Sequence, residues 1–285
     1  MAIIFQQYFM LCVVMVGIFG LCIGSFLNVV IYRLPLMMEA QWRAECAEYL
    51  NQPAAKQDIF NLCVPRSHCP NCKTMIPLWH NIPLLSFILL LRKCRHCQQK
   101  ISWVYPLVEL ISGLSAAYMA YRFGFSWQMI GASIFSWFLI ASIFIDIKHL
   151  LLPDTMTLSL LWLGLLWNLS NGFTSLENAV IGAVMGYVVL WCIAWLFKKI
   201  RKMDGMGYGD FKLTAALGAW LGWQLLPFTI MLAAVLGAVL GILIMVIKKY
   251  SRTTPLPFGP YLAVAGWVAL LWGHNFLNWY WKILT

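Results

Sequence analysis

Long apolar runs separated by short polar segments dominate the chain. The first 32 residues carry no charge, and the run from Tyr8 to Tyr32 exceeds the roughly 20 apolar residues that cross a bilayer as a helix. The run 213–247 is too long for one crossing. Because proline removes a backbone donor and Gly222 precedes it, we predict a break near Gln224 to Pro227 into two short or tilted helices. Five further apolar runs are each counted as one helix: 104–121, 127–145, 156–170, 177–197 and 260–281. With the first run and the two helices of 213–247, the pattern predicts an all-α polytopic membrane protein of about eight transmembrane helices.

The composition agrees with a membrane protein. Hydrophobic residues make up 62% of the chain and charged residues 11%. A soluble globular domain has about a quarter of its residues charged. The composition therefore excludes an ordinary soluble enzyme.

The positions of the basic residues predict the orientation. Short cytoplasmic loops collect Lys and Arg, and with the N-terminus outside, 18 of the 20 basic residues lie on the cytoplasmic side. Residues 1–32 are then the first transmembrane helix, 33–103 a small cytoplasmic domain between helices 1 and 2, and 104–285 a transmembrane domain. The net charge of +10 is expected to face anionic membrane lipid. No nucleic-acid partner is needed to explain it.

Two aspartates lie at the same predicted membrane surface. Asp146 closes an uncharged apolar run, and Asp210 follows the alternating glycines Gly205, Gly207 and Gly209. Glycine permits positive φ and close approach of another segment. An ionised carboxylate beside hydrocarbon is costly, so each aspartate is a functional-site hypothesis. With two crossings between them, the two residues can meet in space.

A pair of facing carboxyl groups can hydrolyse a peptide. Proximity and low polarity separate their pKa values, so that one group takes a proton from water while the other polarises the scissile carbonyl. The alternative for any single aspartate is a helix cap, and we predict that role for Asp154. Lys148 and Lys212 are expected to anchor the membrane boundary.

Four cysteines in the polar segment predict a zinc site. Cys69 and Cys72 form one CxxC pair, and Cys94 and Cys97 form a second. Four thiolates at this spacing suit tetrahedral structural zinc. Disulfides and a redox pair are the alternatives, disfavoured by a reducing compartment and by the duplication. We expect His68, His80 and His96 to be bystanders.

A short apolar stretch lies between the two CxxC pairs. Asn81-Ile82-Pro83 leads into residues 84–91, which are Leu-Leu-Ser-Phe-Ile-Leu-Leu-Leu. This stretch is too short to cross a bilayer. We expect it to dip into the membrane interface.

Taken together, these motifs resemble the type IV prepilin peptidases, which are membrane leader peptidase/N-methyltransferases. The resemblance covers roughly residues 20–262 and rests on the conjunction of motifs in order. The segments that carry it are Gly24 to Pro35, the two CxxC pairs, Asn81 to Pro83, Tyr105 to Glu109, Asp146 to Asp154, Gly207 to Leu213, and Pro257 to Gly259-Pro260. In many relatives a second acidic residue stands two positions after the first catalytic aspartate, where this chain has Lys148.

The resemblance implies a GxGD-type aspartic protease with Asp146 and Asp210 as catalytic residues in a protease domain 104–285. It implies cleavage of the basic leader from type IV prepilins and type II secretion pseudopilins at the cytoplasmic face of the bacterial inner membrane. It also implies N-methylation of the new N-terminus with S-adenosylmethionine. The residues themselves offer no independent site for that methyl donor.

Two other functions remain open at this point. A transporter would use the same carboxylates as a proton or cation site, although the paired broken helices of many transporters are not evident beyond the Pro227 break. A noncatalytic pilus or secretion assembly factor would depend on the cysteines and tolerate loss of the aspartates.

Overall fold

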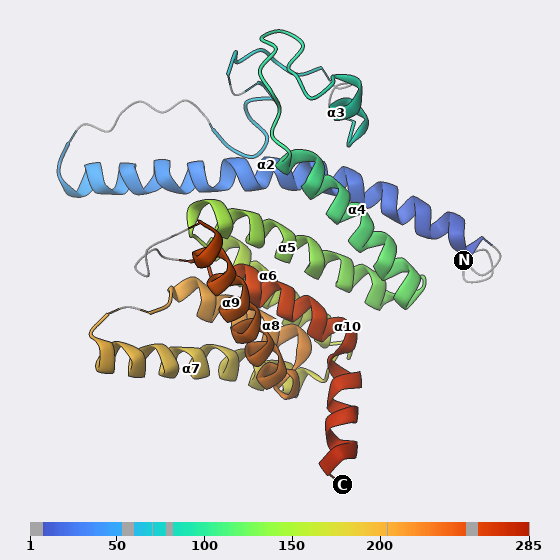
Figure 1. The fold of residues 1–285 in the computed structure, drawn as a ribbon, viewed down its shortest axis with the longest axis vertical. Helices are drawn as coiled ribbons and strands as arrows, with labels where there is room; N and C mark the ends of the chain where they lie inside the picture. The colour runs from blue at the N-terminus through green and yellow to red at the C-terminus, as the bar shows by residue number, and fades with distance from the viewer. Residues whose placement is uncertain are drawn as a thin grey trace. The chain divides into compact units, whose positions relative to one another are not determined.

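The structure is a computed structural model that describes residues 8–52, 60–69, 71–77, 82–203, 205–248 and 256–284. Pro70, His80 and Asn81 of the motifs above lie outside the described residues. In the described parts the chain is helical, and its only β pairing is two isolated bridges. The elements (Figure 1) are α2 Phe9–Tyr49, α3 Leu85–Leu89, α4 Val104–Phe123, α5 Trp127–His149, α6 Asp154–Asn168, α7 Leu176–Arg201, α8 Tyr208–Leu221, the 3₁₀ helix η2 Trp223–Leu225, α9 Leu226–Lys248 and α10 Gly259–Leu284.

The chain divides into two compact units. Unit 1 comprises residues 1–141 and unit 2 comprises residues 142–285. Helix α5 begins in unit 1 and ends in unit 2. The cysteine pairs therefore lie in unit 1, and both aspartates lie in unit 2.

The predicted apolar runs form helices, and among the residues that the structure describes four stretches are long and apolar enough to cross a membrane. These are Phe9–Tyr49, Trp127–His149, Leu176–Arg201 and Trp223–Ile247. They support a membrane protein. The eight crossings and the outside position of the N-terminus stay predictions.

Helix α2 continues past the first predicted crossing. It passes Arg33 and Pro35 and ends at Tyr49. Arg33 is buried, and its guanidinium donates to the carbonyl oxygens of Asn61 at 2.9 Å and Pro65 at 2.6 Å. A buried cation needs such partners. Arg33 thus fastens the segment before the first CxxC pair to α2.

Small residues bring α2 and α4 close together in unit 1. A Cβ at Gly20 would lie 2.7 Å from the Ala116 Cβ, and one at Gly24 would lie 2.7 Å from the Glu109 Cα. Gly20 and Gly24 are four residues apart, the spacing with which membrane helices approach closely. Asn28 then donates to the Tyr105 carbonyl at 3.0 Å. These contacts fix the two helices in register.

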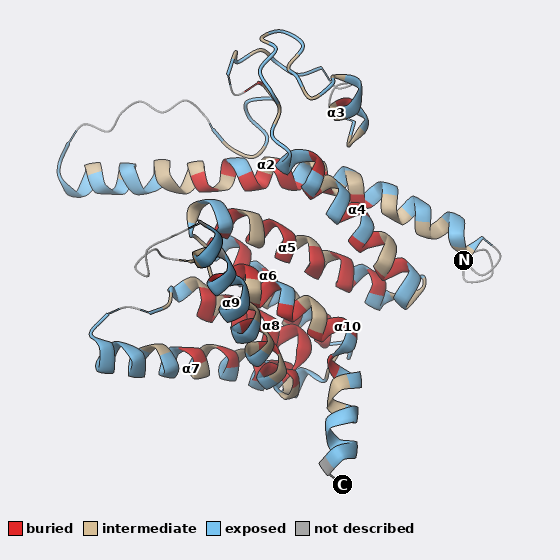
Figure 2. Ribbon diagram, viewed as in Figure 1, coloured by how far each residue is buried: buried red, intermediate tan, exposed pale blue. Residues whose placement is uncertain are grey.

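Helix α8 is the buried centre of unit 2 (Figure 2). Every residue from Leu213 to Leu221 is buried, together with Asp210 and Phe211. Its 14 residues span about 21 Å, less than the roughly 30 Å hydrocarbon core. Helices α6, α7 and α10 pack against it. Protein contacts therefore account for its apolar sequence.

The predicted break in the run 213–247 is confirmed, and of the two residues named for it, Gly222 rather than Pro227 ends the helix. Helix α8 ends before Gly222, whose φ of 81° favours glycine. Trp223–Leu225 forms a 3₁₀ turn, and Pro227 lies in the first turn of α9, where proline is tolerated. The glycine ends the first helix, and the proline falls at the start of the second.

Candidate active site and metal centre

Asp146 lies in the last turn of α5. The helix ends at His149, and Leu150 follows with φ 54° while its N–H donates to the Asp146 carbonyl at 2.9 Å. A left-handed residue after a helix is a common way to end it. The Asp146 side chain is only 5% exposed. The end of α5 therefore holds this carboxyl group inside unit 2.

Asp210 lies in the first turn of α8. Its N–H donates to the Gly207 carbonyl, and the neighbouring Phe211 packs edge-on against Tyr187 of α7, with ring centroids 5.9 Å apart. The Asp210 side chain is 7% exposed. Packing of α8 between its neighbours thus buries the second carboxyl group.

The two carboxyl groups act on each other electrostatically. Asp210 lies outside the four candidate membrane spans. Burial, followed by the negative charge of Asp146, raises the pKa of Asp210 to about 7, against a backbone N–H from Gly207 that lowers it. The structure brings the two predicted residues together. Such a pair can share one proton near neutral pH, which is the state needed to activate water and polarise a carbonyl.

A third segment, the start of α10, closes on this pair. A Cβ at Gly259 would lie 2.6 Å from the Asp146 Oδ2 and 3.0 Å from the Leu152 Cδ1. A Cβ at Gly209 would lie 2.7 Å from the Leu152 Cβ. Leu152 therefore lies between Gly209, the residue before Asp210, and Gly259, which lies against Asp146.

The glycines before Asp210 act differently from the expectation of positive φ. Gly207 has a φ of −78°, and the positive-φ glycines of the described chain are Gly124 and Gly222. A Cβ at Gly207 would lie 3.8 Å from the Asp210 Oδ2, an ordinary contact. Close approach, the other expected role, applies at Gly209.

The predicted cap role of Asp154 is wrong. The N-cap of α6 is Pro153, and Asp154 lies in the first turn without a side-chain capping bond. Its two carboxylate oxygens instead accept hydrogen bonds from the Lys212 Nζ, at 2.6 Å for Oδ1 and 2.7 Å for Oδ2. Lys212, expected only to anchor the boundary, links α8 to α6. The two residues are 58 positions apart in the sequence, so local patterns could not predict this pair.

The two CxxC pairs form matching hairpins in unit 1. In the first hairpin, the Cys69 N–H donates to the Thr74 carbonyl and the Lys73 N–H donates to the Cys69 carbonyl. In the second, the Cys94 N–H donates to the Gln99 carbonyl and the Gln98 N–H donates to the Cys94 carbonyl. Lys73 and Gln98 both adopt left-handed backbone, with φ 58° and 57°. Each tight turn therefore points its two thiols the same way.

The four sulfurs have the spacing of a tetrahedral metal site. All four lie within 4.8 Å of one another, with Cys69 and Cys97 3.8 Å apart and Cys72 and Cys94 4.0 Å apart. Zn–S bonds of 2.3 Å at tetrahedral angles place sulfurs roughly 3.8 Å apart. A disulfide would need sulfurs about 2 Å apart. The cluster could hold a metal ion, and its sulfur-only donor set fits zinc.

The thiols of this cluster differ in acidity. Burial raises the pKa of Cys69 to about 11, whereas hydrogen bonding from Thr74 lowers the pKa of Cys72 to about 6. Metals bind the thiolate.

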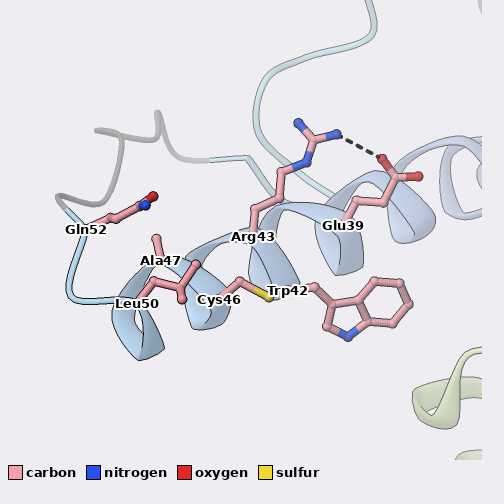
Figure 3. A pocket seen from close by; sticks show the side chains of 7 residues that line it. All are labelled: Glu39, Trp42, Arg43, Cys46, Ala47, Leu50 and Gln52. Atoms are coloured by element: carbon pink, nitrogen blue, oxygen red, sulfur yellow. Dashed lines mark ion pairs between the residues drawn. The ribbon is translucent and has the colours of Figure 1, made fainter.

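A hollow of about 370 Å³ at the end of α2 belongs to neither site. Figure 3 shows the Glu39–Arg43 ion pair across it, with a nitrogen to oxygen distance of 3.8 Å. An exposed pair at this distance contributes little stability. The residues around the hollow are Glu39, Trp42, Arg43, Cys46, Ala47, Leu50 and Gln52. Neither the aspartates nor the four clustered cysteines line it.

Sequence reasoning missed two residues at the aspartate pair. Leu152 carries no chemistry, and its contact with Gly209 is visible only in the fold. Gly259 lay within a quoted motif, but nothing in the sequence connected it with Asp146, 113 residues earlier.

Comparison with known proteins gives a consistent family. Residues 18–123 match the bacterial peptidase A24 N-terminal domain, and residues 133–242 match the type IV leader peptidase family. A prepilin leader peptidase/N-methyltransferase of Stutzerimonas stutzeri is 53% identical over 93% of this chain and 91% of its own. Proteins of the same name from Pseudomonas aeruginosa and Legionella pneumophila are 50% and 43% identical, covering 95% and 98% of this chain and 93% and 96% of their own.

No solved structure matched the chain. The two family models nevertheless follow each other in order, one over the segment with the cysteine pairs and the other over the segment with both aspartates. The relatives are similar over nearly the full length. The chain therefore belongs to the type IV leader peptidase family, among the prepilin leader peptidase/N-methyltransferases.

Proposed function

We propose that this protein removes the leader peptide from type IV prepilins and pseudopilins at the cytoplasmic face of the bacterial inner membrane and then methylates the new N-terminal amine. The single observation that carries the protease half is the pair of buried, interacting carboxyl groups of Asp146 and Asp210. They lie within the segment that matches the type IV leader peptidase family. A transporter or an assembly factor has no comparable support.

Asp146 and Asp210 are the catalytic residues in this proposal. One carboxylate accepts a proton from water, the resulting hydroxide attacks the scissile carbonyl, and the other carboxyl group donates its proton toward the carbonyl oxygen. Collapse of the tetrahedral intermediate expels the amine, which takes up the proton that the first carboxyl group removed from water, while the second carboxyl group recovers its proton from the intermediate's hydroxyl. The raised pKa of Asp210 keeps much of it protonated at neutral pH. The two residues titrate as a unit, so we assign roles to the pair.

The methyl donor in this proposal is S-adenosylmethionine, as the names of the relatives imply. The donor supplies an activated methyl group that the free amine attacks. The hollow at the end of α2 is lined by residues between Glu39 and Gln52, and their arrangement does not point to an adenosyl group. We therefore assign no contact residues for the donor.

Mass spectrometry of a prepilin incubated with the purified protein tests both activities. We expect the leader to be lost with or without S-adenosylmethionine, and the mass of one methyl group to be gained only with it. An intact prepilin under both conditions would refute the protease. Leader loss without any methyl gain would refute the second activity alone.

The four clustered cysteines are proposed to bind one structural zinc. Metal binding at such a site supplies folding free energy to a small module. Elemental analysis of the purified protein should find about one zinc per chain, and Cys72→Ser should lose most of it because three thiolates bind zinc less tightly than four. Cys63→Ser is the matched control, since Cys63 is exposed and outside the cluster. A wild-type protein without zinc, or equal zinc in both variants, would contradict the assignment.

A further inference from the structure

Helix α3 has an inverted pattern of burial. Its one buried residue is Ser86, whereas Leu85, Ile88 and Leu89 are exposed. Leu89 is 79% exposed, and Leu91 just beyond the helix is 81% exposed. In water, each large apolar side chain left exposed in this way forgoes the stabilisation that burial would give, which is about a tenfold or larger change in the folding equilibrium constant. The pattern is that of a surface in contact with lipid.

The start of α3 is held at the depth of the apolar part of α2. The N–H of Leu84 donates to the Glu109 Oε2 of α4 at 2.9 Å. Glu109 lies directly against Gly24 of α2. Gly24 stands nine residues before Arg33, the first charge in α2, which corresponds to about 13 Å along the helix. Leu84 therefore lies within the reach of one glutamate side chain from Gly24, in the uncharged part of α2.

Aromatic contacts fix the rest of α3 at the start of α4. Phe87 packs against Trp103 with ring centroids 5.0 Å apart, and the Arg92 guanidinium lies 4.9 Å from the centre of the Trp103 ring. Trp103 directly precedes α4 and is exposed. Tryptophan is enriched where protein meets the edge of a bilayer.

Cationic residues accompany the exposed leucines. A hollow of about 380 Å³ beside α3 is lined by leucines, including Leu89 and Leu91, and by Lys93 and Arg95. Apolar side chains next to cations match the acyl chains and anionic headgroups of a lipid surface. We propose that α3 docks the segment that carries the two CxxC pairs onto the membrane. In this arrangement the leucines of α3 enter the bilayer edge near Arg33, and Lys93 and Arg95 bind anionic headgroups.

Photocrosslinking in a bilayer tests this docking. The full chain carries p-benzoylphenylalanine at position 89 and is reconstituted in nanodiscs of phosphatidylethanolamine and phosphatidylglycerol. The control places the same residue at position 75, since Met75 is a comparably exposed apolar residue on the first CxxC hairpin. We expect lipid adducts at position 89 to exceed those at position 75 by roughly tenfold, because only α3 reaches the acyl chains. Equal yields, or adducts to protein alone at position 89, would overturn the proposal.

A second arm tests the cations and separates charge from burial. A cation beside an anionic membrane surface strengthens binding by about fivefold. We therefore expect Lys93→Gln with Arg95→Gln to lower the lipid adduct yield at position 89 by at least about fivefold, and replacement of phosphatidylglycerol by phosphatidylcholine to do the same for the unchanged chain. A yield that responds to neither change would overturn the headgroup contact.

Discussion

Asp210→Asn and Asp146→Asn should each lower the rate of leader cleavage by about a thousandfold or more, because removal of an acid or base from a proton-transfer pair typically costs 10² to 10⁴. Both side chains are buried, and the charge of Asp146 helps to raise the pKa of Asp210 to about 7. An amide cannot hold or release the shared proton. The measurement is the initial rate of leader loss from a prepilin.

Two controls separate this effect from misfolding. Asp154→Asn changes the same functional group at an exposed ion pair with Lys212, and such pairs contribute about 1 kcal/mol or less, so we expect less than a tenfold change. Methylation of a pilin from which the leader has already been removed should continue in all three variants. Cleavage within tenfold of the wild type in either Asp146→Asn or Asp210→Asn would sink the dyad.

Gly259→Ala should lower cleavage by about a hundredfold without a comparable loss of methylation. The new Cβ would lie 2.6 Å from the Asp146 Oδ2, closer than real contacts allow, and Leu152 at 3.0 Å leaves little space on the other side. The carboxyl group must then move, and a displacement of about 1 Å in a catalytic group can cost about 10²-fold in rate. The rate of leader loss is again the measurement.

Gly241→Ala is the matched control for this substitution. It lies inside α9, and its new Cβ would lie 3.4 Å from the Leu256 Cδ1, an ordinary contact. Alanine is also the better helix former, so we expect activity within about threefold of the wild type. If Gly259→Ala cleaves as fast as Gly241→Ala, the start of α10 does not position Asp146.

Local patterns predicted the parts of the fold that depend on nearby residues. The apolar runs became helices because helix hydrogen bonds are internal to each segment. The CxxC pairs became matching turns because two ligands three residues apart suffice to define each turn. The prediction that α8 and α9 are separate helices held because Gly222, one of the two residues named for the break, adopts positive φ at the end of α8.

Predictions failed where a side chain found a partner far along the chain. Asp154 was expected to cap its own helix, a local bond, but the ammonium of Lys212 is the stronger partner for its carboxylate. Arg33 was counted as a charge beside the membrane, whereas its guanidinium donates to three backbone carbonyls of one segment, those of Asn61, Leu62 and Pro65. Neither partner can be read from neighbouring residues.

The sequence by itself determined the helical membrane character, the four-cysteine cluster and the two aspartates, because hydrophobicity, ligand spacing and the expense of a charge near hydrocarbon are properties of short segments. The tertiary structure decided which residues surround Asp146 and Asp210. Packing of α5, α8 and α10 placed Leu152 between Gly209 and Gly259 and put Gly259 against the Asp146 carboxyl group. Such contacts arise only when helices distant in sequence are packed together.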